Sequence, residues 1–439
     1  MAVQAMRTRI SILILLFAAI ACGAPDFHEL IQSGKASLGK ADYPAAERLF
    51  LEACDPAGGP FSADMNGSCE HHLAIVSEAR GDLVQAETRL LKALAAWEKA
   101  GREFLPSYAM TAMDLGEVYR KEHRPADAER YLLRALDLAR EVSEAYPQIY
   151  PEALSRLGGA YAAADNATKG KQLVAEGIDA FRRLSQPQPA EEARAFNTLG
   201  IVDLLESHET QAITHLGEAV QLSVGAIGEN HPDTAAYQSD LALAYIRARQ
   251  FDRAEPLLNR ARFVLESQPV PNRLRLGTIM AELSMVACAH NKLAQAEEFG
   301  DRATAILGTL PEQDHAAGLL ARVNIAASFL AQHRLAPAER ILPATVEAER
   351  QIAPDSCLLA DGLRILALLR AQQHSWREAL DMYRESLDIY ERKMGPGSPA
   401  IVPLLRDYAD AVRHSGGSKT EAKRIDARAR AISGYLPPA

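Results

Sequence analysis

The stretch LGEVYRKEHRPADAERYLLRALDLA, residues 115–139, predicts two helices joined by a tight turn. On both sides of its centre, apolar residues recur at spacings of three and four, which is the period of an amphipathic helix. Pro125 stands near the centre, and proline suits the first turn of a helix but breaks a helix interior. A second helix should therefore begin at that residue. The pattern returns as LALAYIRARQFDRAEPLLNRARFVL at residues 241–265, so the helical hairpin is a repeated unit.

The repeat continues along almost the whole chain. A small residue in the second helix recurs at intervals of 40 to 43 residues, as Ala46, Ala86, Ala128, Gly170, Ala212, Ala254, Ala296, Ala338, Ala379 and Ala422. In nearly every unit another small residue, such as Gly116 or Gly158, lies twelve positions earlier. Antiparallel helices approach to about 8 Å only where the facing side chains are small. One hairpin alone would expose its apolar faces, so neighbouring hairpins must stack.

The first helix of the quoted stretch resembles the tetratricopeptide repeat, because Leu115-Gly116 is followed by Tyr119 and by small residues on the second helix. That family usually has a period of ~34 residues. The 42-residue interval found here is similar to the longer repeats of kinesin light chains and related bacterial arrays. The resemblance covers residues 27–433 and leaves residues 434–439 as a tail. It implies an all-α fold, a right-handed α-solenoid superhelix of about ten helical hairpins, without catalytic residues.

Residues 1–21 have the pattern of a secretory signal peptide. The apolar run ISILILLFAAIA at residues 10–21 follows basic residues, is too short for a stop-transfer helix and ends in small residues. An uncleaved anchor or a chance apolar start is the alternative. Cys22 makes AIAC resemble a bacterial lipobox, whose cysteine carries diacylglycerol, although Ala19 stands where that family prefers leucine. We therefore expect an exported protein, periplasmic or an outer-membrane lipoprotein, with ordinary cleavage and no lipid as the open alternative.

Cys54 and Cys69 flank the irregular stretch between the first two repeats. In an exported protein such a pair can form a disulfide, and closing a loop of this length would stabilise the fold by ~3 kcal/mol. Two unpaired thiols are the alternative. Cys69 and His72 lie one helical turn apart, but no second pair with metal-ligand spacing accompanies them. We therefore expect no metal site.

The sequence contains no established catalytic or cofactor motif. The GxGxxG, Walker A, HExxH and GxSxG patterns are all missing, so we expect no enzyme activity and no cofactor. The formal net charge is −9, and no long basic run is present. Nucleic acid is therefore not an expected partner.

By the tetratricopeptide resemblance, the first helices should line a concave groove that binds extended or helical peptides. The predicted partner-binding residues are Arg194, Asn197, Ile201, Leu204, Leu243, Ile246, Met285, Leu320, Val323 and Leu330. Charged groove positions in the end repeats include His71, Glu78, Glu117, Arg120, Asp361, Arg364, Arg406 and Arg413. An apolar stripe rimmed by charge is typical of a partner site. Tight curvature that buries these residues against each other is the alternative.

The leading functional hypothesis is a non-enzymatic scaffold that holds a protein or peptide partner in this groove. The alternatives are an envelope enzyme or enzyme subunit that uses the groove for substrate, and the sensor arm of a signalling system. The scaffold hypothesis predicts that Leu243→Asp or Ile246→Asp abolishes partner binding without unfolding. Leu241→Asp, on the core face, should unfold its repeat.

Overall fold

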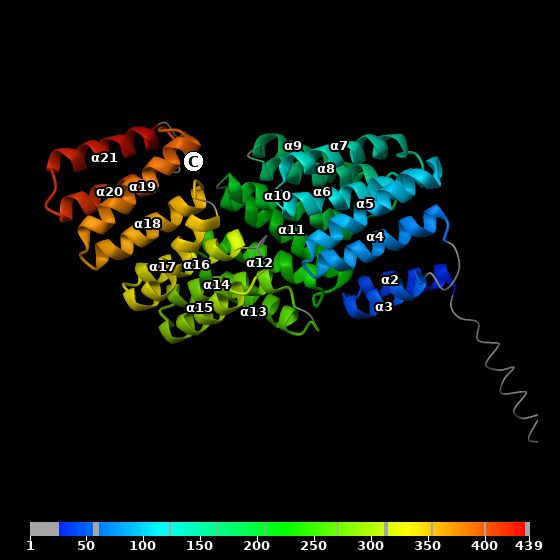
Figure 1. Ribbon diagram of the computed structural model, residues 1–439, viewed down its shortest axis with the longest axis horizontal. Coiled ribbons are helices and arrows are strands. Elements are labelled where there is room, and N and C mark those ends of the chain that lie inside the picture. Colours follow the sequence, from blue (N-terminus) through cyan, green and yellow to red (C-terminus); the bar gives the residue numbers. More distant parts are fainter. Residues whose placement is uncertain are drawn as a thin grey trace, which may run out of the picture. The chain divides into compact units, whose positions relative to one another are not determined.

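The computed structural model describes residues 26–55, 61–122, 124–164, 166–206, 208–269, 271–310, 315–352, 354–398 and 401–434. These residues form twenty α-helices, α2 to α21, one short 3₁₀ helix and no β-strand (Figure 1). The predicted all-α class is confirmed. The chain divides into two units, residues 1–206 with 221–231, and residues 207–220 with 232–439. Residues of α11 (Glu209–Ile227) belong to both units.

The first unit is a stack of helical hairpins. Helix α2 packs on α3, α4 on α5, α6 on α7 and α8 on α9, and α10 follows (Figure 1). The helices are α2 (Phe27–Leu38), α3 (Tyr43–Ala53), α4 (Ala63–Ala79), α5 (Leu83–Ala100), α6 (Leu105–Lys121), α7 (Pro125–Glu141), α8 (Ile149–Ala163), α9 (Ala167–Arg182) and α10 (Pro189–Leu205), with η2 (Arg102–Phe104) before α6. Helix α7 begins at Pro125, as the sequence predicts.

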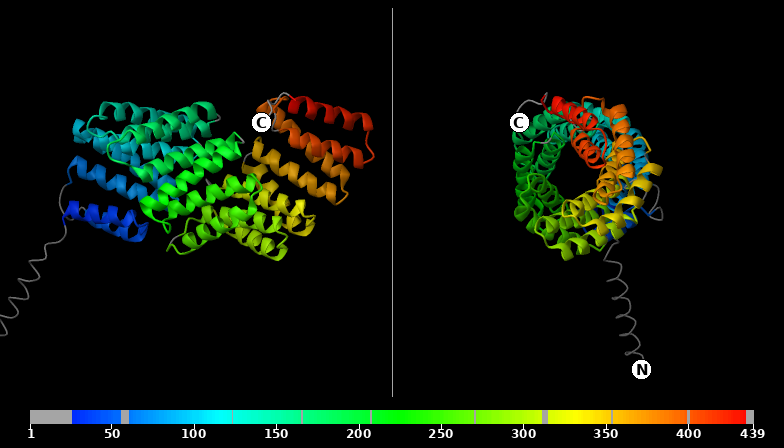
Figure 2. Two further views of the ribbon diagram at one scale, coloured as in Figure 1. Left: turned by 180° about the vertical axis from the view of Figure 1, so that it is seen from behind. Right: turned by 90° about the vertical axis from the view of Figure 1, so that its left-hand side faces the viewer.

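The second unit repeats the same architecture. Its hairpins pair α12 with α13, α14 with α15, α16 with α17, α18 with α19 and α20 with α21 (labelled in Figure 1; Figure 2 shows the same ribbon from two other sides). The bounds are α12 (Pro232–Arg247), α13 (Phe251–Glu266), α14 (Arg273–Ala289), α15 (Leu293–Leu307), α16 (His315–Ala331), α17 (Leu335–Ile352), α18 (Cys357–Gln372), α19 (Trp376–Met394), α20 (Val402–His414) and α21 (Lys419–Gly434). Within each unit, the predicted solenoid of stacked hairpins is confirmed.

Small residues are needed where the two helices of a hairpin cross. A Cβ atom built on Gly158 would lie 2.6 Å from the carbonyl oxygen of Gly170 in the partner helix. A Cβ on Gly116 would lie 2.5 Å from the side chain of Leu132. Both distances are too short for non-bonded atoms, so these helices could not pack as closely with larger residues.

Six of the described hairpin turns share one backbone conformation. The residue five positions before the small residue of the second helix has a positive φ, between 55° and 83°, at Ala41, Gly81, Arg249, Asn291, His333 and His374. Glycine adopts this left-handed conformation without strain, whereas other residues lose about 1 kcal/mol or more in it. His333 and His374 therefore occupy the same turn position in neighbouring repeats.

A disulfide joins α3 to α4 in the first unit. Cys54 and Cys69 are bonded, and their Cα atoms are 5.8 Å apart. This distance lies within the range that a disulfide requires. Cys22 and the expected signal peptide, residues 1–21, lie outside the described residues. In the part of the chain that is described, no helix is long and apolar enough to cross a membrane.

Candidate functional site

The ten residues predicted to bind a partner differ widely in exposure. Arg194 and Leu320 are exposed. Four residues are half-buried, namely Asn197, Ile201, Leu243 and Met285. Four others are buried in the helical core, and for these the predicted location is wrong: Leu204, Ile246, Val323 and Leu330. Arg194, Asn197, Ile201 and Leu204 belong to the first unit, and the six residues from Leu243 onward belong to the second unit.

The buried residues lie in rows that neighbouring first helices cover. Leu204, Ile246 and Leu330 each come four residues after the small residue at which the two helices of a hairpin cross. Consecutive first helices also contact each other, and α14 packs against both α12 and α16. Rows that would be open on one hairpin are thus closed in the stack. Ile246→Asp should therefore disrupt the fold and cannot test partner binding.

An apolar row remains accessible in the second unit. The residue directly after each crossing position on α12, α14, α16 and α18 is apolar and half-buried: Leu243, Met285, Ala327 and Leu368. Because these four helices pack side by side, the apolar row is continuous from repeat to repeat. Leu320 lies two helical turns before Ala327 on the same face of α16, and its side chain is 44% exposed. The second unit thus offers a strip of aliphatic side chains on a rigid helical surface.

Two buried carboxyl groups border the apolar row. Asp240 and Glu282 lie three residues before members of the row, on α12 and α14. Arg275 donates from its Nη1 to Oδ1 of Asp240 at 2.6 Å, and Ser239 Oγ donates to Oε2 of Glu282 at 3.2 Å. Burial raises the pKa of Glu282 to about 8; Asp240 adds to this rise and Arg275 opposes it. Arg275 thus forms a hydrogen bond with Asp240, whereas only its charge acts on Glu282.

In the first unit, the corresponding positions carry ion pairs. Asp114 on α6 accepts hydrogen bonds from Nε2 of His71 at 2.9 Å and from Nη1 of Arg156 at 2.8 Å. Arg156 also donates from Nη2 to Glu152 at 2.7 Å. Burial on its own would raise the pKa of Asp114, but Arg156 and His71 outweigh it and hold that pKa well below its usual range. This network joins α4, α6 and α8.

The imidazole of His71 extends the network into the core. Its Nδ1 lies 3.0 Å from Oγ1 of Thr111, which also accepts a hydrogen bond from Nε1 of Trp97 at 3.1 Å. The side chains of His71 and Thr111 are buried. Because these polar groups are satisfied within the protein, they stabilise the packing of the repeats rather than offering a ligand site.

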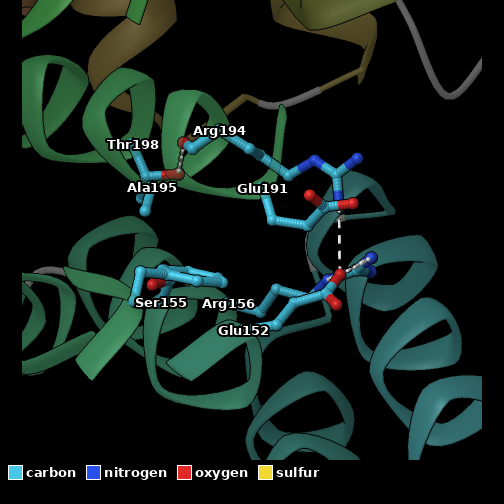
Figure 3. A pocket seen from close by; sticks show the side chains of 8 residues that line it. Glu152, Ser155, Arg156, Glu191, Arg194, Ala195 and Thr198 are labelled. Carbon is cyan, nitrogen blue, oxygen red and sulfur yellow. Dashed lines mark hydrogen bonds and ion pairs between the residues drawn. The ribbon is translucent and has the colours of Figure 1, made fainter. Parts of the chain in front are cut away.

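A shallow depression lies between α8, α9 and α10 (Figure 3). Its lining comprises Glu152, Ser155, Arg156, Phe181, Glu191, Arg194, Ala195 and Thr198. Arg194 donates from Nη1 to Oε1 of Glu152 at 3.1 Å, as Figure 3 shows. The space inside is ≈ 20 Å³, about that of one water molecule. The depression is therefore too small for an organic ligand.

Charged groove positions predicted in the end repeats also interact within the protein. Arg120 pairs with Glu117 at 2.5 Å, and Arg364 pairs with Asp407 at 2.7 Å. Glu78 accepts from Lys121 at 2.7 Å. Much of the charge that was expected at the rim of the groove is therefore neutralised by ion pairs within the protein.

The CEHH segment offers no metal site in the described structure. The sulfur of Cys69 is bonded to Cys54, so it cannot act as a thiolate ligand. Nδ1 of His72 lies 2.7 Å from the backbone oxygen of Ser68, and burial lowers the pKa of His72 to about 3. His72 is therefore a neutral residue that packs between the first two repeats.

Sequence reasoning missed the buried charges Asp114, Arg156 and Glu282. Each lies two residues before the small residue of its first helix, so the repeat itself marks this position. Comparing residues 42 positions apart would have placed Asp114 beside Arg156, as the structure does.

The chain matches family models described as "Tetratricopeptide repeat" at residues 68–141 and 209–267 and, with a second model, at residues 363–400. No curated protein matches it.

Solved structures resemble the fold. A Rap protein complexed with competence and sporulation factor gives a TM-score of 0.56 at 14% identity, covering 83% of this chain and 96% of that one. The apo form of the quorum sensor NprR from B. thuringiensis gives 0.52 at 14% identity, covering 82% and 97%. A signal transduction ATPase with a tetratricopeptide repeat sensor, from Pyrococcus horikoshii, gives 0.51 at 13% identity, covering 80% and 52%. At these identities the likeness concerns the fold alone.

Proposed function

We propose, on the premise that this chain is a tetratricopeptide repeat protein, that it is an interaction scaffold which binds a protein or peptide through the apolar row of its second unit. The tetratricopeptide fold is generally a non-enzymatic interaction scaffold. The observation that carries the proposal is the accessibility of Leu243, Met285, Ala327 and Leu368 on four adjacent helices.

The physical basis is the burial of aliphatic surface on a preorganised support. Each apolar side chain that a partner covers contributes about 25 cal/mol per Å² of area removed from water. The row stands on packed helices, so little conformational freedom is lost when the partner binds. Each of the four hairpins contributes one residue to the row, so a partner that lies along the row would contact one apolar side chain per hairpin.

The solved structures of similar fold support the kind of partner proposed. One of them is a Rap protein in complex with competence and sporulation factor, and another is a quorum sensor. Arg194, Asn197 and Ile201 of the first unit are accessible as well. We propose these three as secondary candidates for partner binding, on the surface of the first unit.

The experiment compares capture of partners by variants of the protein without residues 1–21. Leu243→Asp and Met285→Asp each place a charge in the apolar row without removing a fully buried side chain. Val84→Asp is the matched control, because Val84 is 67% exposed on α5 of the first unit. Affinity capture with quantitative mass spectrometry should show partners that the wild type and Val84→Asp retain and that both row variants lose about tenfold or more. Circular dichroism must show equal folding, and retention of every partner by both row variants would refute the proposal.

We further propose that the protein is exported and that Cys22 becomes its first residue. The basis is the signal-like pattern of residues 1–21 followed by Cys22. Intact-mass analysis of protein from the native host decides this. A chain that begins at Met1 would refute export, and a mature mass without diacylglycerol would refute only lipidation.

A further inference from the structure

Asp114 of the first unit and Glu282 of the second unit occupy the same place in their repeats. Each lies two residues before the small residue of a first helix, and each side chain is largely buried. The position at the same place in the next repeat is Arg156 for Asp114 and Asn324 for Glu282. The two sites are therefore matched in repeat position and differ in the residue that stands one repeat later.

The first unit shows what this position requires. Arg156 reaches back one repeat, and its Nη1 lies 2.8 Å from Oδ1 of Asp114. A guanidinium group thus compensates a carboxylate that is shielded from water. A buried carboxylate without such a partner is strongly destabilised in its charged form.

Glu282 has no equivalent compensation. Its Oε2 accepts one hydrogen bond, from the neutral hydroxyl of Ser239. Its Oε1 has no hydrogen-bond donor among the described residues and is not fully shielded from solvent. Arg275, the cation whose charge acts on Glu282, is paired with Asp240 at 2.6 Å. Glu282 thus has an unpaired oxygen that solvent can reach.

Asn324 supplies no guanidinium at the repeat position that Arg156 takes in the first unit. Its side chain is exposed, shorter than arginine and uncharged. The apolar row passes directly beside this place, because Met285 follows Glu282 by three residues on α14. A ligand that lies along the row could therefore present a cationic group to Glu282.

We propose that the partner of the second unit carries a lysine or arginine side chain that pairs with Glu282, in the place that Arg156 occupies in the first unit. This inference rests on the proposed function, because it names the chemistry of the partner at the same surface. An alkyl group contacts the apolar row and the cation contacts the carboxylate. When Glu282 is protonated before binding, its proton leaves to solvent as the ion pair forms.

The groups that face Glu282 set the sign of the pH dependence. Burial raises the pKa of Glu282 most and Asp240 on α12 raises it further, whereas Arg275 on the same helix and the hydrogen bond from Ser239 lower it. Below the raised pKa, binding a cation must displace a proton. Binding should therefore strengthen as the pH rises from 6 towards about 8, and each binding event in that range should release a proton.

The test uses a fragment in place of the unidentified partner. Isothermal titration with n-pentylguanidinium, in buffers of different ionisation enthalpy, should detect binding and proton release by the chain that lacks residues 1–21. The neutral isostere n-pentylurea and the tail-free methylguanidinium should each bind with an affinity at least about tenfold lower than that of n-pentylguanidinium. Equal binding of methylguanidinium would mean that a free cation, rather than a side chain lying on the apolar row, occupies the site, and this would refute the proposal.

Two substitutions separate the site from the rest of the surface. Glu282→Gln should abolish the preference for guanidinium over urea. Asn324→Arg, which copies Arg156, should abolish fragment binding by filling the place internally. Asp252→Asn is the matched control, because its side chain is 99% exposed in the same unit. Guanidinium binding that persists in Glu282→Gln, or no selective binding up to the solubility of the fragments, overturns the proposal.

The outcome is distinguishable from failure of the proposed function. If Leu243→Asp loses its partners while Glu282→Gln and Asn324→Arg keep them, the scaffold function stands and the cation inference is wrong. If the row variants keep all partners, the scaffold site itself is wrong, whatever the fragments do.

Discussion

Asp114 in the first unit and the buried Glu282 and Glu349 in the second have opposite ionisation behaviour, although the units are built from the same repeat. In the first unit, Arg156 and His71 hold the pKa of Asp114 below its usual range. In the second unit, burial raises the pKa of Glu282 and of Glu349 to about 8. The repeat places residues 42 apart next to each other, so a cation in the neighbouring repeat, such as Arg156 beside Asp114, can outweigh the effect of burial on the pKa of a carboxyl group.

Glu349 on α17 is the more extreme case. Its side chain is fully buried, and neither carboxyl oxygen has a hydrogen-bond partner. The carboxyl group packs directly against the backbone of Gly362 on α18, and a Cβ there would clash with it. Asp361, the other nearby charge, adds to the rise in pKa that burial causes. Glu349 therefore weakens the packing of α17 on α18 whenever it is ionised.

The largest expected effect concerns the compensated network. Arg156→Leu removes the guanidinium and leaves Asp114 and Glu152 without their shared cation. Removing one partner of a buried ion pair costs about 3–5 kcal/mol. Hydrogen exchange should show faster opening of α6 and α8, with α14 and α16 unchanged. Arg340→Leu, at an exposed ion pair on α17, is the control and should change little. Equal effects of the two variants would show that the first unit does not depend on its buried charges.

Reduction of the disulfide should also affect one unit only. Cys54→Ser with Cys69→Ser opens a closed loop and should destabilise the first hairpin by ~3 kcal/mol. Limited proteolysis of α2 and α3 should accelerate, while fragments from the second unit appear at the wild-type rate. Wild-type protein treated with a reductant should behave like the double variant. Protection of α2 and α3 that does not depend on oxidation would contradict this expectation.

Glu349→Gln should change the pH dependence of the second unit. The folded pKa of Glu349 is raised above its value in the unfolded chain, so its stability contribution is complete below pH 4.5 and is lost as the pH rises through about 8. At pH 9 the amide should stabilise the unit by about 1–3 kcal/mol, the cost of an uncompensated buried group. Thermal unfolding from pH 5 to 9 measures this. A parallel pH profile for both proteins would mean that Glu349 finds a partner or water on ionisation.

The smallest expected effect is common to both units and serves as their baseline. Ala41→Gly in the first unit and His374→Gly in the second relieve a positive φ of 55° and 62°. Each should stabilise its hairpin by up to about 1 kcal/mol. Chemical denaturation followed by hydrogen exchange should show similar gains in both units. A gain in only one unit would indicate that the turns, like the buried acids, have diverged.

The fold could be predicted because the hairpin is a local feature. The 42-residue interval, the proline at the start of α7 and the small crossing residues all appear within one repeat, and the structure agrees with each. The partner surface could be predicted only in part. Whether Leu243 or Ile246 is accessible depends on how closely α14 packs on α12, which a single repeat does not reveal. The 42-residue period shows which residues are neighbours along the stack, but the exposure of their side chains depends on the distance between adjacent first helices.

The bond between Cys54 and Cys69 also changes the connectivity of the polypeptide. Residues 54–69 form a covalent ring, so one cut by a protease between residues 55 and 68 opens the ring without releasing either fragment. The nicked protein would migrate as one species without reductant and as two with it. In an oxidising compartment, the first hairpin would therefore stay attached to the array after damage that would otherwise detach it.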